Sequence, residues 1–401
     1  MKTRIWIAAI SVLLSAVILL LLPQATKPVA PPTGPIRPEN PTTTAPAPGV
    51  VRLYSCNQET LPVLTQLAAD YTARTGVEVV VLTAGDTGCM PMLEMLMKGE
   101  NSPTILCMHS QKDLLTWQDT LLDLSGTALE ETLCSPSFGF RVDGKLLAVP
   151  MAVEGMGLLF NARLLSVVMT RNDIWDYTSL ATAVQILESN GLTAFASVPV
   201  GMPVWLRMLH SSDRDTMRSF LDLYMDNQIG KGDAMDQFMS GKTVFILGTT
   251  ADYELLSQQP NQVLALRDLD ILPSCTGQGL QYLCRAAWGV NGSARPADVE
   301  ASLDFLQWLV TATAEAAAPI DQLQILVPFR DSAWYANQLE KKLRGYMQTE
   351  SAVLVWDARI ANDRPLLLAL SNYVDNPTDA NWNALIALIP QAPESQRNQI
   401  D

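Results

Sequence analysis

The sequence of 401 residues has few of the side chains on which most enzymes and metal sites depend. It contains two histidines, and none of its six cysteines forms a C-x-x-C pair, so a zinc site is not predicted. It has no G-x-S-x-G nucleophile turn and no H-E-x-x-H pair. We therefore expect no catalytic residues, no cofactor and no metal, and we interpret the chain as a binding protein and not an enzyme.

Positive charge is also scarce, since 27 Lys and Arg face 41 Asp and Glu and give a net charge of −14. Such a chain repels phosphates, which argues against nucleic acid as a partner. The segment Ser240-Gly241-Lys242-Thr243 resembles the end of a phosphate-binding loop. Asp236 stands where that motif requires glycine, so nucleotide binding is not expected.

The N-terminus indicates export. Lys2 and Arg4 precede Ile5–Leu22, a run without charge that is long enough for a membrane-spanning helix. No small-x-small cleavage site and no lipid-bearing cysteine follow it, so residues 1–22 are expected to be an uncleaved signal anchor, with a cleaved signal peptide as the alternative. Residues 23–49 contain nine prolines and are predicted to form an extended linker.

The six cysteines agree with an oxidising compartment, because their even number allows a disulfide framework. The one pairing that we predict joins Cys275 to Cys284 across a short loop. Buried free thiols remain the alternative for the other cysteines.

The folded part begins with alternating strands and helices. Apolar strands are predicted at 50–56, 77–82 and 104–108, and apolar residues at helical spacing occupy 59–74 and 90–97 between them. Strands that are apolar throughout, separated by helices, are typical of a parallel sheet covered on both faces.

Ligands of such sheets bind beyond the carboxyl ends of the strands. Those positions hold Asn57 and Gln58 after the first strand, Asp86 after the second and His109 after the third, and we predict that they bind a ligand. Two simpler roles are also open, because Asp86 can cap the next helix and His109 can satisfy a backbone carbonyl.

The stretch Leu146–Asn161 is almost entirely apolar and is too long for an ordinary strand. Pro150, Gly155 and Gly157 interrupt it, so it is predicted to form two short buried strands joined by a kink. We interpret it as a hinge between two lobes, with its one carboxylate, Glu154, near the cleft. A buried crossover with a single satisfied acid is the alternative.

Tryptophan is the other candidate for ligand contact, because aromatic faces stack on sugar rings while amides and carboxylates bind hydroxyls. Trp205 follows chain-breaking residues, Trp288 lies at a predicted crossover between lobes and Trp334 follows a polar turn. We predict that these three line the binding site. Trp308 and Trp382 lie in helical patterns and are expected in the core.

Several short motifs then resemble one known family, the extracellular solute-binding proteins of ABC sugar importers. They occur in the family's order over about residues 50 to 310. They comprise Leu122-Asp123-Leu124, Asp143-Gly144-Lys145, Gly157–Asn161, Ser240–Gly248, Ile271-Leu272-Pro273 and Trp288–Asn291.

The resemblance implies an α/β architecture, the two-lobed type II periplasmic-binding-protein fold, in which each lobe is a mainly parallel sheet flanked by helices. It places residues 50–154 and 276–318 in the first lobe and 155–275 and 319–401 in the second. It further implies an extracytoplasmic monomer that captures a mono- or oligosaccharide and delivers it to ABC transporter permease subunits.

Two other functions remain open at this stage. The same fold could serve as a membrane-anchored sensor or scaffold, since the lipid-bearing cysteine is missing. Less favoured is a secreted enzyme acting on glycosides, for which the sequence gives no reason to pair any two carboxylates.

Overall fold

A computed structural model describes residues 47–56, 58, 60–84, 88–198, 214–249, 252, 264–265, 268–272, 281–311, 328–330, 346–347, 353–355 and 364–389. The chain divides into two units, Met1–Pro46 and Ala47–Asp401, and every described residue belongs to the second unit. In the described ranges no helix has the length and apolar character needed to cross a membrane. The predicted anchor at 1–22 and the linker up to residue 46 lie outside these ranges.

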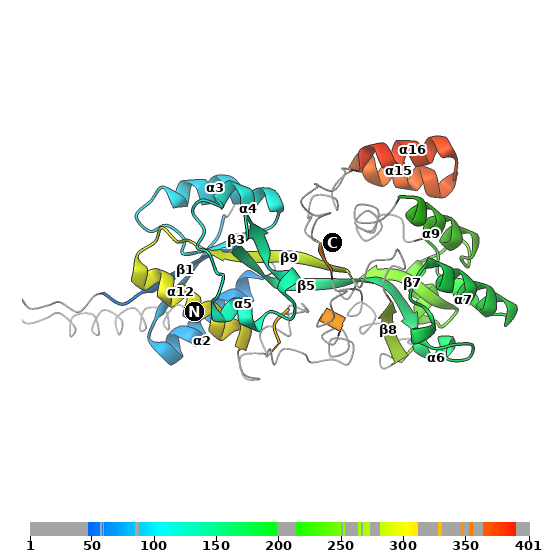
Figure 1. The fold of residues 1–401 in the computed structure, drawn as a ribbon, viewed down its shortest axis with the longest axis horizontal. Coiled ribbons are helices and arrows are strands. Elements are labelled where there is room, and N and C mark those ends of the chain that lie inside the picture. The colour runs from blue at the N-terminus through cyan, green and yellow to red at the C-terminus, as the bar shows by residue number, and fades with distance from the viewer. Residues whose placement is uncertain are drawn as a thin grey trace, which may run out of the picture. The chain divides into compact units, whose positions relative to one another are not determined.

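The first elements follow the predicted alternation (Figure 1). They are β1 (Val50–Tyr54), α2 (Leu61–Thr75), β2 (Glu78–Leu82), α3 (Cys89–Met97) and β3 (Ile105–Met108). β1 pairs in parallel with both β2 and β3, which confirms the predicted parallel order. α2 ends where Gly76 adopts a φ of 75°, a left-handed conformation that glycine takes without strain.

The remaining elements complete an α/β chain. They are α4 (Gln111–Trp117), α5 (Ala128–Thr132), η2 (Pro136–Phe138), β4 (Phe140–Val142), β5 (Lys145–Asn161), α6 (Ala162–Leu165), η3 (Arg171–Asp173), α7 (Tyr177–Ser189), β6 (Thr193–Phe195), α9 (Arg214–Asp226), α10 (Ala234–Met239), β7 (Thr243–Thr249), β8 (Leu269–Leu272), β9 (Gln281–Val290), α12 (Pro296–Thr311), β10 (Val353–Val355), α15 (Arg364–Asp375) and α16 (Asp379–Leu388).

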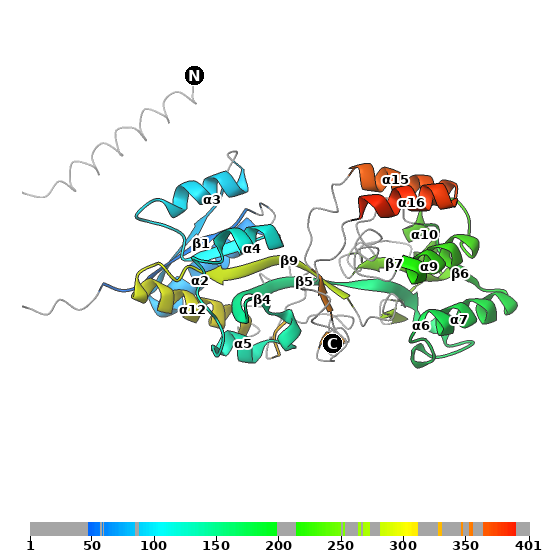
Figure 2. The same ribbon diagram turned by 45° about the horizontal axis from the view of Figure 1, so that its top comes forward.

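The strands form one sheet in the order β2-β1-β3-β9-β5-β7-β6, and the predicted α/β class is confirmed (Figure 2). Parallel pairs occur between β1 and its two neighbours, between β6 and β7, and between β9 and β10. β5 pairs antiparallel with β4, β7, β8 and β9, because it carries the chain away from the first strands while β9 brings it back. The sheet is therefore parallel at its flanks and antiparallel at its centre.

The prediction that Leu146–Asn161 forms two short strands is wrong. The 17 residues of β5 form one strand, and its pairing with β9 shifts register between Pro150 and Ala152 and again between Ala152 and Val153. Pro150 has no N–H to donate, so a break in the ladder at this point loses little. Gly157 allows β8 to approach closely, since a Cβ there would lie 2.1 Å from the backbone oxygen of Leu272.

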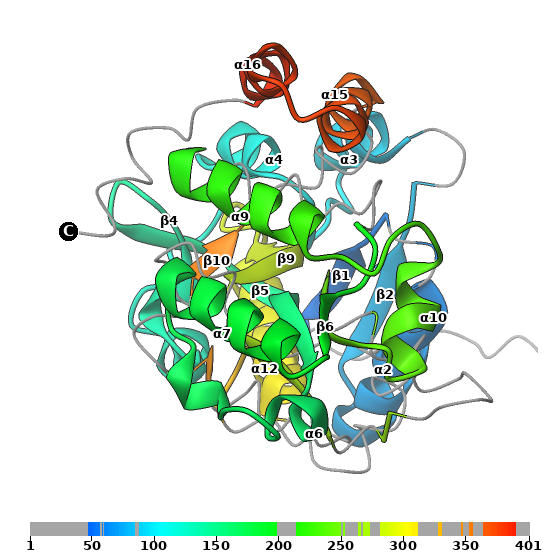
Figure 3. The same ribbon diagram turned by 90° about the vertical axis from the view of Figure 1, so that its right-hand side faces the viewer.

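Two large apolar clusters form the core, and β5 supplies side chains to both. Val149 and Val153 belong to the cluster around β1, α2 and α12, whereas Leu158 and Phe160 belong to the cluster around α7, α9 and β7. Figure 3 shows α7 and α9, which both belong to the second cluster, next to each other. One continuous strand thus connects the two cores.

Aromatic contacts hold the helices within each cluster. In the first, the ring of Tyr71 on α2 lies 5.1 Å from the rings of Phe305 and Trp308 on α12. In the second, Tyr373 packs against Trp382 at 5.2 Å, which joins α15 to α16. Trp308 and Trp382 therefore pack against the core, as their helical spacing predicted.

A buried carboxylate fixes the start of β1. Asp298 on α12 accepts hydrogen bonds from the Val50 N–H at 2.9 Å and from the guanidinium groups of Arg52 and Arg295 at 3.3 and 2.6 Å. Burial alone would raise the pKa of the Asp298 carboxyl. The hydrogen bonds from Arg295, Val50 and Arg52 outweigh it and hold the pKa below its ordinary value.

Replacing Asp298 with Asn should lower the free energy of unfolding by about 1–3 kcal/mol at neutral pH, because hydrogen bonds to a charged group are lost. A lowered folded-state pKa gives stability that is present above about pH 4 and lost as the pH falls through the folded pKa. Urea unfolding should therefore show a difference between wild type and variant that shrinks towards acidic pH. Glu300→Gln, which removes an exposed charge from the same helix, should show a small difference at every pH, and an equal pH dependence for both variants would contradict this role of Asp298.

Gly157→Ala should destabilise the protein by about 1–3 kcal/mol, because its Cβ overlaps the β8 backbone and forces the strands apart. Gly99→Ala is the matched control, since the nearest atom to its Cβ is 3.4 Å away. Chemical denaturation of both variants checks this expectation. Equal stabilities would show that β8 moves aside without cost.

Candidate functional site

The carboxyl ends of β1, β2 and β3 meet at one edge of the sheet. Tyr54, the last residue of β1, lies opposite Leu82 of β2 and Leu106 of β3. The side chains that follow these strands are therefore neighbours, as the sequence predicted from the parallel order. The described residues at this edge include Cys56, Gln58, Thr83, Cys89 and His109.

A disulfide joins Cys56 to Cys89 across this edge, linking the segment after β1 to the first residue of α3. Their Cα atoms are 5.5 Å apart and 33 residues apart in sequence. The even number of cysteines predicted disulfides but not this pair. The available signal was that Cys56 directly follows a strand and Cys89 begins the helix after its parallel neighbour.

The predicted pairing of Cys275 with Cys284 is wrong. Cys284 is a free thiol on β9, and it lies opposite Val153 of β5 inside an apolar cluster that includes Met108 and Leu147. Its burial raises the pKa of the Cys284 thiol well above the ordinary value, so it remains protonated. Cys275 lies outside the described residues.

The disulfide is surrounded by polar contacts. The Tyr54 hydroxyl donates a hydrogen bond to the carbonyl of Cys89 at 2.5 Å and lies 3.3 Å from Cys56 Sγ. Burial raises the pKa of Tyr54, so the hydroxyl remains protonated and able to donate. Gln58, exposed in the turn after Cys56, donates from Nε2 to Thr83 Oγ1 at 3.2 Å. These contacts tie the end of β1 to the end of β2.

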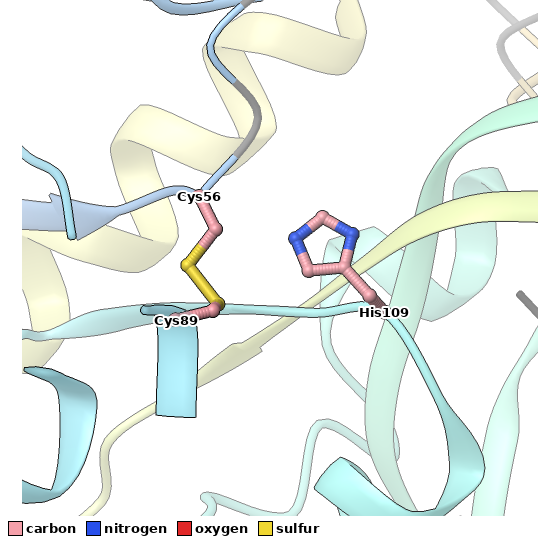
Figure 4. A group of neighbouring side chains, drawn as sticks. All are labelled: Cys56, Cys89 and His109. Atoms are coloured by element: carbon pink, nitrogen blue, oxygen red, sulfur yellow. A yellow bond between two sulfur atoms is a disulfide. The ribbon is translucent and has the colours of Figure 1, made fainter. Parts of the chain in front are cut away.

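His109 follows β3 and is half-buried, with its ring facing the disulfide (Figure 4). The backbone N–H of His109 donates to Asp113 Oδ2 at 3.1 Å, and the ring Nε2 lies 3.7 Å from Cys107 Sγ. The backbone of Asp113 in turn donates to Ser110, which caps α4. The helix start therefore fixes the backbone of His109 beside the disulfide.

Glu154 and Trp288 lie elsewhere, on the central strands. Each is only 5% exposed, and they face Leu283 and Val149 respectively in the β5–β9 ladder. The indole nitrogen of Trp288 is buried and has no hydrogen-bond partner among the described residues. The structure thus brings Gln58 and His109 to one edge and places Glu154 and Trp288 within the sheet. Asn57, Asp86, Trp205 and Trp334 lie outside the described residues.

The fold and the sequence agree on a family. The chain matches the profile of the bacterial extracellular solute-binding proteins over residues 66–343 and belongs to that family. No curated protein sequence matches it significantly.

Solved structures have the same fold at low identity. A family 1 extracellular solute-binding protein from Alicyclobacillus acidocaldarius gives a TM-score of 0.65 at 14% identity, covering 88% of this chain and 98% of that chain. Apo RafE from Streptococcus pneumoniae gives 0.63 at 13%, covering 86% and 98%. The bacterial solute receptor AcbH, described as having an exclusive preference for β-D-galactopyranose, gives 0.64 at 15%, covering 88% and 100%. The chain therefore has the type II periplasmic-binding-protein fold.

Opening the Cys56–Cys89 disulfide should lower the free energy of unfolding by about 3–4 kcal/mol, because the bond closes a loop of 33 residues. Guanidinium unfolding with and without a thiol reductant measures the difference. A Cys56→Ala/Cys89→Ala variant is the control, since its stability should not respond to the reductant. Equal sensitivity of wild type and variant would show that the bond contributes nothing.

Proposed function

We propose that this protein captures a carbohydrate at the carboxyl-end edge of β1, β2 and β3 and delivers it to an ABC importer. The observation that carries the proposal is the shared fold with solute receptors for sugars, together with membership of the solute-binding family. The edge offers an exposed amide at Gln58 and an imidazole at His109, and both group types form hydrogen bonds with hydroxyls.

The other predicted site residues remain part of the proposal. In the sequence Asn57 follows β1, as Gln58 does, and Asp86 follows β2. Trp205 and Trp334 would supply aromatic faces for sugar rings. Glu154 and Trp288 are buried, so their contribution requires a movement that uncovers them.

The proposed capture uses two lobes, residues 50–154 with 276–318 and residues 155–275 with 319–401, that close on the ligand. Support for two lobes comes from β5, because its side chains belong to both apolar clusters. Its pairing with β9 also shifts register between Pro150 and Val153. Such irregular pairing is where a strand bends most readily. Closure would be favoured by contacts that the open form lacks.

Membership of an extracellular family supports an extracytoplasmic location. We further propose that residues 1–22 anchor the chain in the membrane, that residues 23–49 form the linker to the binding unit, and that the protein acts as a monomer with permease subunits. Binding without catalysis is part of the same proposal, since capture requires no chemical change in the ligand.

Isothermal titration against a panel of mono- and oligosaccharides should identify a ligand, and X-ray scattering should show compaction on binding. His109→Ala and Gln58→Ala should each weaken that binding about 5- to 30-fold, because a lost hydrogen bond costs about 1–2 kcal/mol. Gln185→Ala, on the exposed face of α7, is the matched control and should bind as wild type. If no sugar of the panel gives a heat of binding or a compaction, the proposal is overturned.

A further inference from the structure

Within the described ranges, one group of histidine, cysteine and acidic residues is arranged so that it could hold a metal ion. It consists of Cys56, Cys89 and His109, whose ligand atoms all lie within 4.8 Å of one another (Figure 4). We propose that these residues form a zinc site once the disulfide is reduced.

The chemistry of the donors suits Zn²⁺. Two thiolates and an imidazole are the donors that this ion prefers, at about 2.3 Å for sulfur and about 2.0 Å for nitrogen. Tetrahedral geometry at those lengths places the donor atoms about 3.5–3.8 Å apart. The sulfurs must separate from their bond, and the imidazole must approach by about 1 Å, which one rotamer change can supply.

Three separate elements hold the donors, so the site does not depend on a single mobile loop. Cys56 follows β1, Cys89 begins α3, and His109 joins β3 to α4. β1 and β3 are paired directly, and Tyr54 ties the backbone of Cys89 to β1. The three ligands are therefore held in place after the disulfide opens, which lowers the entropy cost of binding the ion.

All three side chains are half-buried, so an ion can enter and solvent can occupy the fourth position. The reaction balances with a water-soluble phosphine as reductant. The S–S bond breaks, each sulfur gains a proton, and the phosphorus is oxidised to a phosphine oxide with oxygen from water. Zn²⁺ then displaces the two thiol protons.

Zinc binding shares His109 with the proposed sugar site, but it does not require that a sugar binds there, because only the two sulfurs and the imidazole act as ligands of the ion. In the oxidised protein the sulfurs are bonded to each other and cannot act as thiolates. Zinc binding is thus expected in the reduced protein and not in the oxidised protein.

The test uses the full chain in both states. Protein reduced with a phosphine, desalted and kept without oxygen is titrated with Zn²⁺ against a competing chelator dye. We expect one Zn²⁺ per chain in the reduced protein and at least about 100-fold weaker binding in the oxidised protein. Co²⁺ in place of Zn²⁺ should give a thiolate-to-metal absorption band in the reduced protein.

The variants distinguish this site from adventitious binding. Cys56→Ser and His109→Gln, compared in the reduced state where wild type also lacks the disulfide, should each weaken binding by at least about 10- to 100-fold, since loss of an outer partner alone costs that much. Cys284→Ala removes a buried thiol outside the group and should bind as wild type.

The inference is overturned if the reduced and oxidised proteins bind Zn²⁺ equally, or if both ligand variants bind as wild type. Loss of binding in Cys284→Ala would also overturn the assignment to these three residues. Circular dichroism of reduced His109→Gln beside reduced wild type separates lost binding from lost folding, because the two proteins then differ only at this side chain.

Discussion

The antiparallel pairing of β5 with β9 is the constraint on which the rest of the structure depends. These strands lie at the centre of the sheet, and the first strands attach through β3 to β9 while β7 and β8 attach to β5. Because side chains alternate along a strand, a slip of one residue would exchange the faces on which Val149 and Leu158 lie. The position of each apolar cluster is therefore set by this one register.

That pairing also explains where function can be built. The parallel strands β1, β2 and β3 all end at one edge of the sheet. Residues just beyond these ends take no part in strand pairing, so polar side chains can occupy these positions. Gln58 and His109 lie there, beside a disulfide that holds the end of β1 against the start of α3. Residues within the central ladder, such as Glu154, are placed instead by the packing of the sheet.

Local pattern in the sequence predicted much of this arrangement. The spacing of Leu64, Leu67 and Tyr71 predicted α2, and the same reasoning located α3, because helix formation and burial of one face depend on neighbours three and four residues away. The alternation of strands and helices predicted which edge of the sheet carries the polar residues. Each of these inferences needs only short-range information or a general rule of topology.

Long-range pairing was harder to predict. Cys284 lies close in sequence to Cys275, which suggested a bond, yet its side chain is fixed by pairing with a strand about 130 residues earlier. In the same way Pro150 indicated a broken strand, but the ladder shifts register there and continues. Such outcomes depend on which distant segments meet, and composition and periodicity carry little of that information.

The hydrogen bond from Val50 to Asp298 has a mechanical consequence. A pull on residues 47–49 along the direction of β1 would load a strand that is hydrogen-bonded to β2 on one side and β3 on the other. The load is shared in shear by two ladders at once, whereas a strand at the edge of a sheet would be peeled away one bond at a time. A force applied to β1 in this direction would therefore be resisted by both ladders together.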